Sequence, residues 1–230
     1  NCPDTVQNYR VISIFFGGGT PSLLTGEQIG RLMDTVREIF TLDEDAEITM
    51  EMNPGTVTEE KLRKYRQAGV NRLSIGLQSV NDEELRLLGR IHTYEEFREA
   101  YHLARANGFS NINVDLISAI PGQTVESWRR TLEQVMALSP EHISAYSLIL
   151  EEGTTFYKKY VEDEAKEGPK LPDEDAERQM YWDTETLMEK NGYHRYEISN
   201  YAKEGYACRH NLGYWERIPY LGFGIGAASL

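Results

Sequence analysis

Short apolar runs alternate with helical apolar periods along most of this chain, and this alternation constrains the fold more than any other feature. Strands are predicted at 11–16, 47–52, 72–77, 111–117 and 142–148, and the apolar run at 11–16 is typical of a buried strand. Between them, apolar residues recur at the spacing of amphipathic helices. Because strands that alternate with helices usually pair in parallel, the sequence predicts an α/β fold, either a (β/α) barrel or an open sheet.

Helix ends carry signals that agree with this division. Three threonines stand three residues before Glu or Gln, the spacing of a capping box, in the pairs Thr25–Gln28, Thr56–Glu59 and Thr93–Glu96. Three glycines stand just past a predicted helix and just before a strand, at Gly69, Gly108 and Gly192. Glycine suits the left-handed residue that ends a helix, so each of these positions is expected to be a helix C-terminus.

The polar stretch from Glu151 to Asp173 interrupts the alternation and is interpreted as a surface excursion. A helix is predicted from about Glu174 to Lys190, and the chain from Tyr193 onward is rich in Tyr, Asn and Gly. We therefore predict a barrel core over residues 1–150. Residues 151–230 are expected to hold the excursion, the last barrel helix and the start of an accessory C-terminal segment.

Composition excludes several classes of protein. A net charge of −13 argues against a general nucleic-acid binder, which must neutralise phosphates. No apolar run reaches the ~18 residues of a membrane-spanning helix, and no signal segment opens the chain. The two cysteines, Cys2 and Cys208, form no disulfide framework and fit a reducing cytoplasm. The first residue is not Met and the chain stops in an apolar Gly-rich run, so we expect a fragment of a longer protein.

Glycines and polar residues follow several predicted strands, at the edge where parallel α/β folds bind ligands. They are Gly17, Gly18, Gly19, Thr20, Glu51, Asn53, Gln78, Ser79, Arg90 and Asp115. Their amide, carboxylate and guanidinium groups suit a small zwitterionic ligand with hydroxyls. Simpler explanations stay open: a tight turn for the glycines, a helix cap for Glu51, an arginine partner for Asp115 and a surface charge for Arg90.

Five segments, in this order, resemble the radical S-adenosylmethionine (SAM) proteins of the coproporphyrinogen dehydrogenase group: ISIFFGGGTPSLL, EMNPGT, RLSIGLQS, LGRIHT and DLISAIPGQT. The resemblance covers essentially the whole chain and implies an incomplete TIM-like (β/α) barrel with parallel strands. It also implies that Gly18, Gly19 and Thr20 contact the methionine end of SAM. The matching positions imply further SAM contacts from Glu51, Gln78, Arg90 and Asp115.

The stretch CRHNLGYW, from Cys208 to Trp215, contains His-Asn-x-x-Tyr-Trp. Together with the preceding YEISNYAKEGYACR, it resembles the HemW branch of that group, whose members are implicated as haem chaperones. The resemblance implies haem binding, with His210 as the candidate ligand of the haem iron, and Cys208 is the alternative, since thiolate also ligates haem. On spacing alone, a single histidine among aromatic residues is more often a packing residue.

The cysteine triad C-x-x-x-C-x-x-C that defines the family is absent from this sequence. Cys2 stands alone and Cys208 is too distant in sequence, so we predict no ligand for a [4Fe–4S] cluster and no catalytic residue in this chain. Either the triad belongs to a missing segment, together with the first barrel strand, or the chain is a natural relative without a cluster. Residues 118–120 and Ala228 also depart from the family pattern, which leaves details of the pocket open.

The resemblance predicts that the intact parent is a cytoplasmic haem chaperone that binds SAM and a [4Fe–4S] cluster. It would bind haem and pass it to a haem-requiring acceptor protein. One alternative is an oxygen-independent coproporphyrinogen III dehydrogenase of porphyrin biosynthesis, and another is a non-catalytic SAM-binding scaffold. We expect no nucleic-acid partner, membrane association only through a partner protein, and a homodimer as a hypothesis, because an open barrel edge invites strand pairing.

Overall fold

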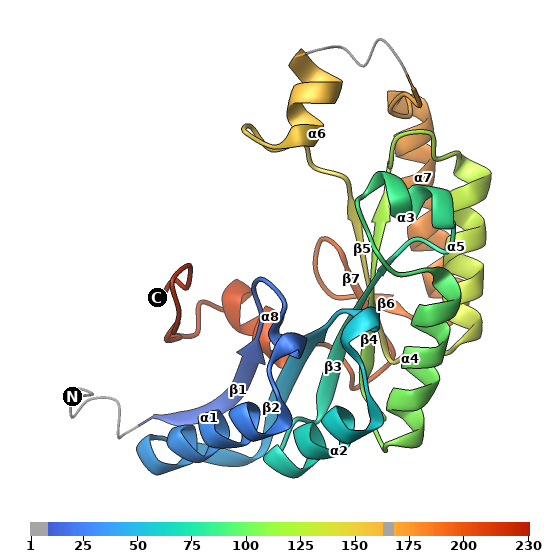
Figure 1. The fold of residues 1–230 in the computed structure, drawn as a ribbon. Coiled ribbons are helices and arrows are strands. Elements are labelled where there is room, and N and C mark those ends of the chain that lie inside the picture. The colour runs from blue at the N-terminus through green and yellow to red at the C-terminus, as the bar shows by residue number, and fades with distance from the viewer. Residues whose placement is uncertain (1–8, 163–167) are drawn as a thin grey trace. The chain divides into compact units, whose positions relative to one another are not determined.

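The computed structural model describes residues 9–162 and 168–230, so Cys2 lies outside the described residues. The predicted alternation of strands and helices is present (Figure 1). The strands are β1 (Arg10–Phe16), β2 (Thr41–Met52), β3 (Arg72–Gln78), β4 (Ile112–Ser118), β5 (His142–Ser147), β6 (His194–Arg195) and β7 (Asn200–Ala202). The α-helices are α1 (Gly26–Ile39), α2 (Glu59–Ala68), α3 (Asp82–Leu87), α4 (Tyr94–Ala106), α5 (Val125–Ala137), α6 (Thr155–Tyr157), α7 (Glu174–Lys190) and α8 (Arg209–Trp215). Three short helical turns are η2 (Pro21–Leu23), η3 (Pro54–Thr56) and η4 (Lys158–Glu162).

The chain forms two compact units, each built from separate segments. Unit 1 comprises Asn1–Gly76, Glu99–Asn113 and Tyr206–Leu230, and unit 2 comprises Leu77–Arg98 and Val114–Gly205. The predicted division of the chain near residue 150 stays a prediction.

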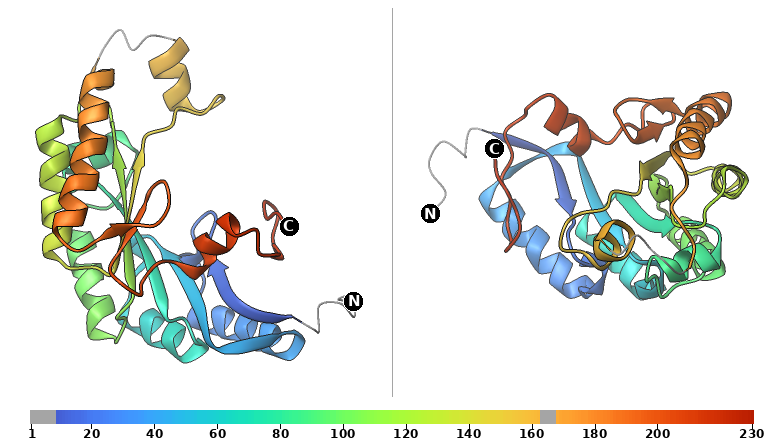
Figure 2. Two further views of the ribbon diagram at one scale, coloured as in Figure 1. Left: turned by 180° about the vertical axis from the view of Figure 1, so that it is seen from behind. Right: turned by 90° about the horizontal axis from the view of Figure 1, so that it is seen from above.

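In unit 1, β1 and β3 pair in parallel with β2, which lies between them. Ser13 stands opposite Glu47 and Phe15 opposite Thr49, so these side chains share one face of the strands. The alternate residues Ile48 and Met50 are buried on the other face. Helices α1 and α2 cover one face of β1 and β2, and α8 lies on the opposite face (Figures 1 and 2).

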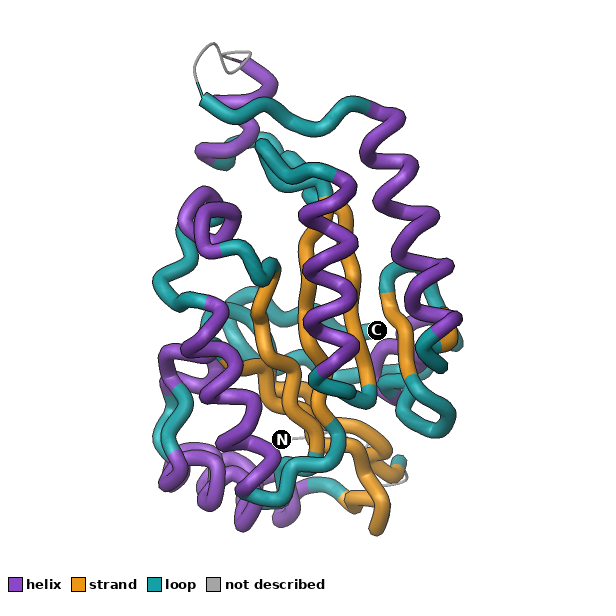
Figure 3. Tube along the Cα trace, turned by 90° about the vertical axis from the view of Figure 1, so that its right-hand side faces the viewer, coloured by secondary structure: helices purple, strands orange, loops and turns teal. Residues whose placement is uncertain are grey.

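In unit 2, the strands follow the order β4-β5-β7-β6. Strand β7 runs antiparallel to β5 and β6, so the C-terminal segment adds antiparallel strands to a fold whose other strands were expected to be parallel. Helices α5 and α7 lie side by side (Figure 3). The fully buried Trp128 and the ion pair of Arg129 with Asp183 connect them. This helix pair forms a large part of the apolar core of the unit.

The helix-end predictions are confirmed with one correction. Thr25 and Gln28 form a capping box, and Thr93 and Glu96 exchange the same bonds. Thr58, not Thr56, caps α2. The Thr56 hydroxyl instead donates to Asn53 O (2.8 Å) within the turn that follows Pro54, and this turn delays the helix. The three predicted helix-ending glycines all have positive φ: Gly69 (107°), Gly108 (83°) and Gly192 (81°).

The accessory segment from Tyr193 contains β6, β7 and α8, and the described part of the predicted excursion contains α6 and η4. These elements are short, so the sequence periodicity did not show them. Within residues 9–162 and 168–230, none of the helices has the length and apolar character that a bilayer crossing requires.

Candidate functional site

The glycine loop that follows β1 exposes its backbone. Gly18 and Gly19 have φ angles of 74° and 59°, and nothing lies within 4 Å of the position that a Cβ would take at either residue. Gly17 is glycine for a different reason, because a Cβ there would stand 2.8 Å from the Phe15 ring. Residues other than glycine rarely adopt such positive φ angles. The loop therefore offers accessible N–H and C=O groups, and Thr20 ends it as the residue preceding η2.

Glu51 ties this loop to the end of β2. Its Oε2 accepts a hydrogen bond from the Gly18 N–H at 3.1 Å. The carboxylate therefore bonds the backbone of the loop. A carboxylate beside accessible backbone amides can accept hydrogen bonds from an ammonium or hydroxyl group of a ligand. Gly18, Gly19, Thr20 and Glu51 thus come together in unit 1.

Gln78 ends β3 with a strained backbone. It is buried, with 6% of its surface exposed, and has a φ of 76° although it is not a glycine. Such conformations cost on the order of 1–3 kcal/mol and persist where the surrounding structure enforces them, often at functional sites. The strain therefore supports the prediction that Gln78 belongs to a binding site.

Arg90 and Asp115 lie near each other in unit 2. Burial lowers the pKa of the Arg90 guanidinium, and the Asp115 carboxylate partly opposes this by favouring the charged form. Arg90 is half-buried, so the explanation of a plain surface charge does not fit it. A partly desolvated guanidinium beside a carboxylate can bind a ligand carboxylate while the Asp115 side chain accepts from a hydroxyl or amine. Gln78, Arg90 and Asp115 all belong to unit 2.

His210 lies in α8, where its ring stacks on Phe15 with centroids 4.8 Å apart and planes 22° apart. Its Nδ1 is 3.3 Å from Ser13 Oγ, and its Nε2 is 3.0 Å from Tyr214 Oη. Tyr214 in turn meets the Tyr220 ring edge-on, with centroids 4.8 Å apart. His210 therefore belongs to a group of aromatic rings. This group, the aromatic cluster, consists of Phe15, His210, Tyr214 and Tyr220.

Burial lowers the pKa of His210, with opposing influences from the Glu47 carboxylate, which raises it, and the Arg72 guanidinium, which lowers it. A lowered pKa keeps the imidazole neutral at physiological pH. The neutral ring is the form that ligates metals. Its Nε2 can reach a metal only after the Tyr214 hydroxyl moves away from it.

The alternative haem ligand, Cys208, has no exposed surface. Its Sγ lies 3.2 Å from Glu47 Oε1, to which the thiol donates. Burial raises the pKa of the thiol to about 11. The Glu47 carboxylate adds to this rise, and the Arg72 guanidinium opposes it. A buried thiol that stays protonated neither reaches nor ligates an iron in this conformation. The geometry therefore favours His210 over Cys208.

Glu47 and Arg72 are residues that the sequence reasoning missed. Both are buried, at 7% and 1% exposed, and both influence the pKa values of Cys208 and His210. A signal for Glu47 was present, because Glu47, Thr49 and Glu51 alternate with apolar residues in a strand. That alternation predicts a strand with one polar face and one buried face.

Iron–sulfur clusters are held by thiolates. Within residues 9–162 and 168–230, no group of three or more His, Cys, Asp or Glu side chains could hold a metal ion. The one cysteine in that part of the chain is the buried Cys208. The described residues therefore do not fit a [4Fe–4S] cluster.

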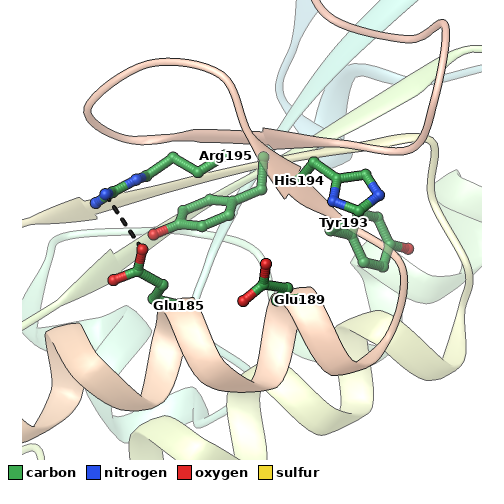
Figure 4. A pocket seen from close by; sticks show the side chains of 6 residues that line it. Glu185, Glu189, Tyr193, His194 and Arg195 are labelled. Atoms are coloured by element: carbon green, nitrogen blue, oxygen red, sulfur yellow. Dashed lines mark ion pairs between the residues drawn. The ribbon is translucent and has the colours of Figure 1, made fainter.

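A depression of about 240 Å³ lies on unit 2, outside the residues discussed so far (Figure 4). It is lined by Glu185, Glu189, Tyr193, His194, Arg195 and Tyr201. The Arg195 guanidinium pairs with the Glu185 carboxylate at 3.2 Å. The depression contains none of the predicted site residues, and its ion pair indicates a structural role in joining β6 to α7.

Comparisons with known proteins agree with the sequence resemblance. The family model described as the radical SAM superfamily matches residues 3–135. The chain is 42% identical over 97% of its length to the heme chaperone HemW of Haemophilus influenzae, and 44% identical over 96% to that of Escherichia coli. It spans about half the length of these curated relatives, 56% of each.

Among solved structures, the chain resembles coproporphyrinogen III oxidase (HemN) from Escherichia coli, a radical SAM enzyme. The TM-score is 0.79 at 28% sequence identity, over 97% of this chain and 53% of that one. This likeness confirms the predicted fold class, an α/β fold of the incomplete (β/α) barrel type.

Proposed function

This chain belongs to the radical SAM superfamily, and from that premise we propose that the intact protein is a haem chaperone. It binds haem through His210 and delivers it to a haem-requiring acceptor protein. The observation that carries the proposal is the place of the His210 ring in the aromatic cluster, stacked on Phe15 and edge-on to Tyr214. Imidazole is a common axial ligand of haem iron, and aromatic rings can pack on the porphyrin face. The relatives that bear the name heme chaperone support the same assignment.

We assign SAM binding to Gly18, Gly19, Thr20, Glu51, Gln78, Arg90 and Asp115. The glycine loop fits this ligand because its backbone is free of Cβ atoms where a ligand would approach. Arg90 would bind the SAM carboxylate, and the carboxylates of Glu51 and Asp115 would accept from its ammonium or ribose hydroxyl groups. When bound, SAM would gate haem transfer in the intact protein, and any one-electron chemistry on it would need an electron from the [4Fe–4S] cluster. The described residues of this chain bind and orient it.

The radical SAM family implies a [4Fe–4S] cluster, which we assign to the intact protein, although the residues that the structure describes do not fit it. No step of haem transfer is routed through that cluster here. The protein is expected to act in the cytoplasm, with SAM and haem as small-molecule ligands and a haem acceptor as its protein partner. A homodimer remains a hypothesis, and the net charge of −13 disfavours nucleic acid.

The deciding experiment for function uses the full-length protein, prepared without oxygen. A chaperone should take up ferric haem, with an absorbance spectrum typical of histidine ligation, and transfer it to an apo-protein that requires haem. The second candidate is a coproporphyrinogen III oxidase, which the 28% identity to that enzyme favours. Formation of decarboxylated product from coproporphyrinogen III, without haem transfer, would establish the oxidase and refute the chaperone.

Replacing Gly18 with valine is expected to weaken SAM binding on the order of tenfold to a hundredfold. A β-branched residue at the φ of 74° adds about 1–3 kcal/mol of strain or forces the loop out of its shape. Equilibrium dialysis with labelled SAM measures the change.

The control is Gly153→Val, because Gly153 has a φ of 81°, is equally open around its Cβ position and lies outside the proposed SAM site. That variant should carry similar strain but bind SAM as the wild type does. Equal loss in both variants would mean that the glycine loop has no special part in binding SAM.

Haem binding is expected to depend on pH through His210. The ligating form is neutral, and burial lowers the folded-state pKa below the ordinary value of 6.5, so affinity should stay constant as pH falls to about 6.5. It should fall only once the pH passes below that lowered pKa, because protonation blocks the ligating nitrogen. Haem titrations from pH 8 to pH 5, with circular dichroism at each pH as the folding control, test this. A loss of affinity centred above pH 7 would contradict it.

A further inference from the structure

The Glu47 carboxylate collects three hydrogen-bond donors from the segment that carries His210. Its Oε1 accepts from Cys208 Sγ and from the His210 N–H, both at 3.2 Å. Its Oε2 accepts from the Arg209 N–H at 3.1 Å. The three donors belong to consecutive residues, so a single side chain of β2 holds the start of α8.

These bonds matter because they satisfy backbone N–H groups in the first turn of α8. Cys208 precedes α8 and makes no side-chain cap bond to the helix, so the free N–H groups of Arg209 and His210 depend on Glu47. Burial of the carboxylate, 7% exposed, excludes water as a competing partner and strengthens each bond. The buried Arg72, 1% exposed, places a positive charge close enough to influence both Cys208 and His210.

The same bonds set the orientation of the His210 ring. The backbone N–H of His210 is fixed to Glu47 on β2, while its ring stacks on Phe15 and its Nδ1 meets Ser13, both on β1. Ser13 and Glu47 are partners in the β1–β2 register. The imidazole therefore has little freedom to rotate, because β2 holds the start of α8 and β1 holds the ring.

We propose that Glu47 is a positioning residue for haem binding: its carboxylate orders residues 208–210 and so presents His210 to the iron. The proposal rests on the proposed function, because it deepens the role of the same haem site. Groups that orient a metal ligand typically change metal affinity by about 10–100-fold when they are replaced.

The test compares Glu47→Ala and the isosteric Glu47→Gln with the wild type in the full-length protein, with ferric haem as the probe. Glu47→Ala is expected to weaken haem binding by about tenfold or more, and Glu47→Gln by less, because one amide oxygen still accepts. Asp45→Asn is the matched control. Asp45 lies on the same strand and pairs with the Arg209 side chain at 2.7 Å, but this pair is exposed and makes no bond to the helix backbone.

Two further readouts separate positioning from a general loss of structure. Hydrogen exchange should speed up at the amides of Arg209 and His210 in Glu47→Ala while the β1 and β2 amides stay protected. In a double-mutant cycle, Glu47→Ala should have no further effect on haem affinity once His210 is alanine.

The outcomes distinguish this proposal from the proposed function. If His210→Ala weakens haem binding and Glu47→Ala does not, Glu47 has no positioning role. Unchanged exchange at Arg209 and His210 would overturn it as well. If the wild type binds no haem, or binds it equally without His210, the proposed function fails and the haem role of Glu47 fails with it. The exchange data would then still show whether Glu47 orders α8.

Discussion

Replacing His210 with alanine is expected to weaken haem binding on the order of 100-fold, or about 2.7 kcal/mol. The variant removes the nitrogen that would ligate the iron and leaves the rest of the aromatic cluster in place. A titration of the protein with ferric haem, followed by absorbance, measures the affinity and the ligation state together. The spectrum of histidine-ligated haem should disappear, and weak unspecific binding should remain.

The matched control for this substitution is His194→Ala. His194 is an exposed histidine of β6, in unit 2, and does not belong to the aromatic cluster. Its replacement should leave haem affinity within about twofold of the wild type, since exposed surface substitutions change stability by roughly 0.5 kcal/mol or less. If His210→Ala binds haem with the wild-type spectrum, another residue ligates the iron and the chaperone site lies elsewhere.

A change in stability alone cannot mimic the expected result. His210→Ala loses the Phe15 stack and the two ring hydrogen bonds, which together contribute on the order of 1–3 kcal/mol. Thermal unfolding in the absence of haem records this cost separately. A variant that unfolds cooperatively but no longer shows histidine-ligated haem would have lost the ligand and kept the fold.

Replacing Trp128 with alanine is expected to lower the free energy of unfolding by about 3–5 kcal/mol. The side chain is fully buried between α5 and α7. Its Nε1 donates to Thr184 Oγ1 at 2.8 Å and to Met180 O at 3.2 Å. The variant therefore creates a large cavity and removes both of these hydrogen bonds. Urea unfolding followed by circular dichroism measures the loss.

Trp182→Ala is the matched control because Trp182 lies on the same helix, α7, with 54% of its surface exposed. It should cost roughly 1 kcal/mol or less, since exposed side chains contribute little burial energy. Domains are stable by only about 5–15 kcal/mol, so Trp128→Ala should remove a large fraction of the total. Equal losses in the two variants would mean that the α5–α7 pair is not the core of unit 2.

Much of the fold could be predicted from the sequence because it rests on local interactions. Thr25 and Gln28 signal the start of α1 through bonds that span three residues, and Gly69 signals the end of α2 through its own backbone freedom. The helix predicted from about Glu174 to Lys190 is likewise present, as α7. Thr56 was the exception, because its hydroxyl donates to Asn53 O in a turn instead of capping α2.

The candidate site divides in the same way. The glycine loop and the residues at strand ends could be found from their order in the chain, and their resemblance to a family identified His210. Their roles as SAM and haem contacts stay predictions. The bond between Glu51 and the Gly18 N–H joins residues 33 positions apart, and neither residue alone indicates it.

Only the tertiary structure decided how His210 is held. The bonds from Glu47 to Cys208, Arg209 and His210 join residues 161–163 positions apart, and they decide that Cys208 is a buried donor. No local period in the sequence records such a bond, because its partners lie far apart in the chain. By itself, the sequence determined the alternating elements and the residues that could do chemistry. The packing of α8 against β1 and β2 determined which of those residues meet, because hydrogen bonds from residues 208–210 to the Glu47 side chain form only when the chain is folded.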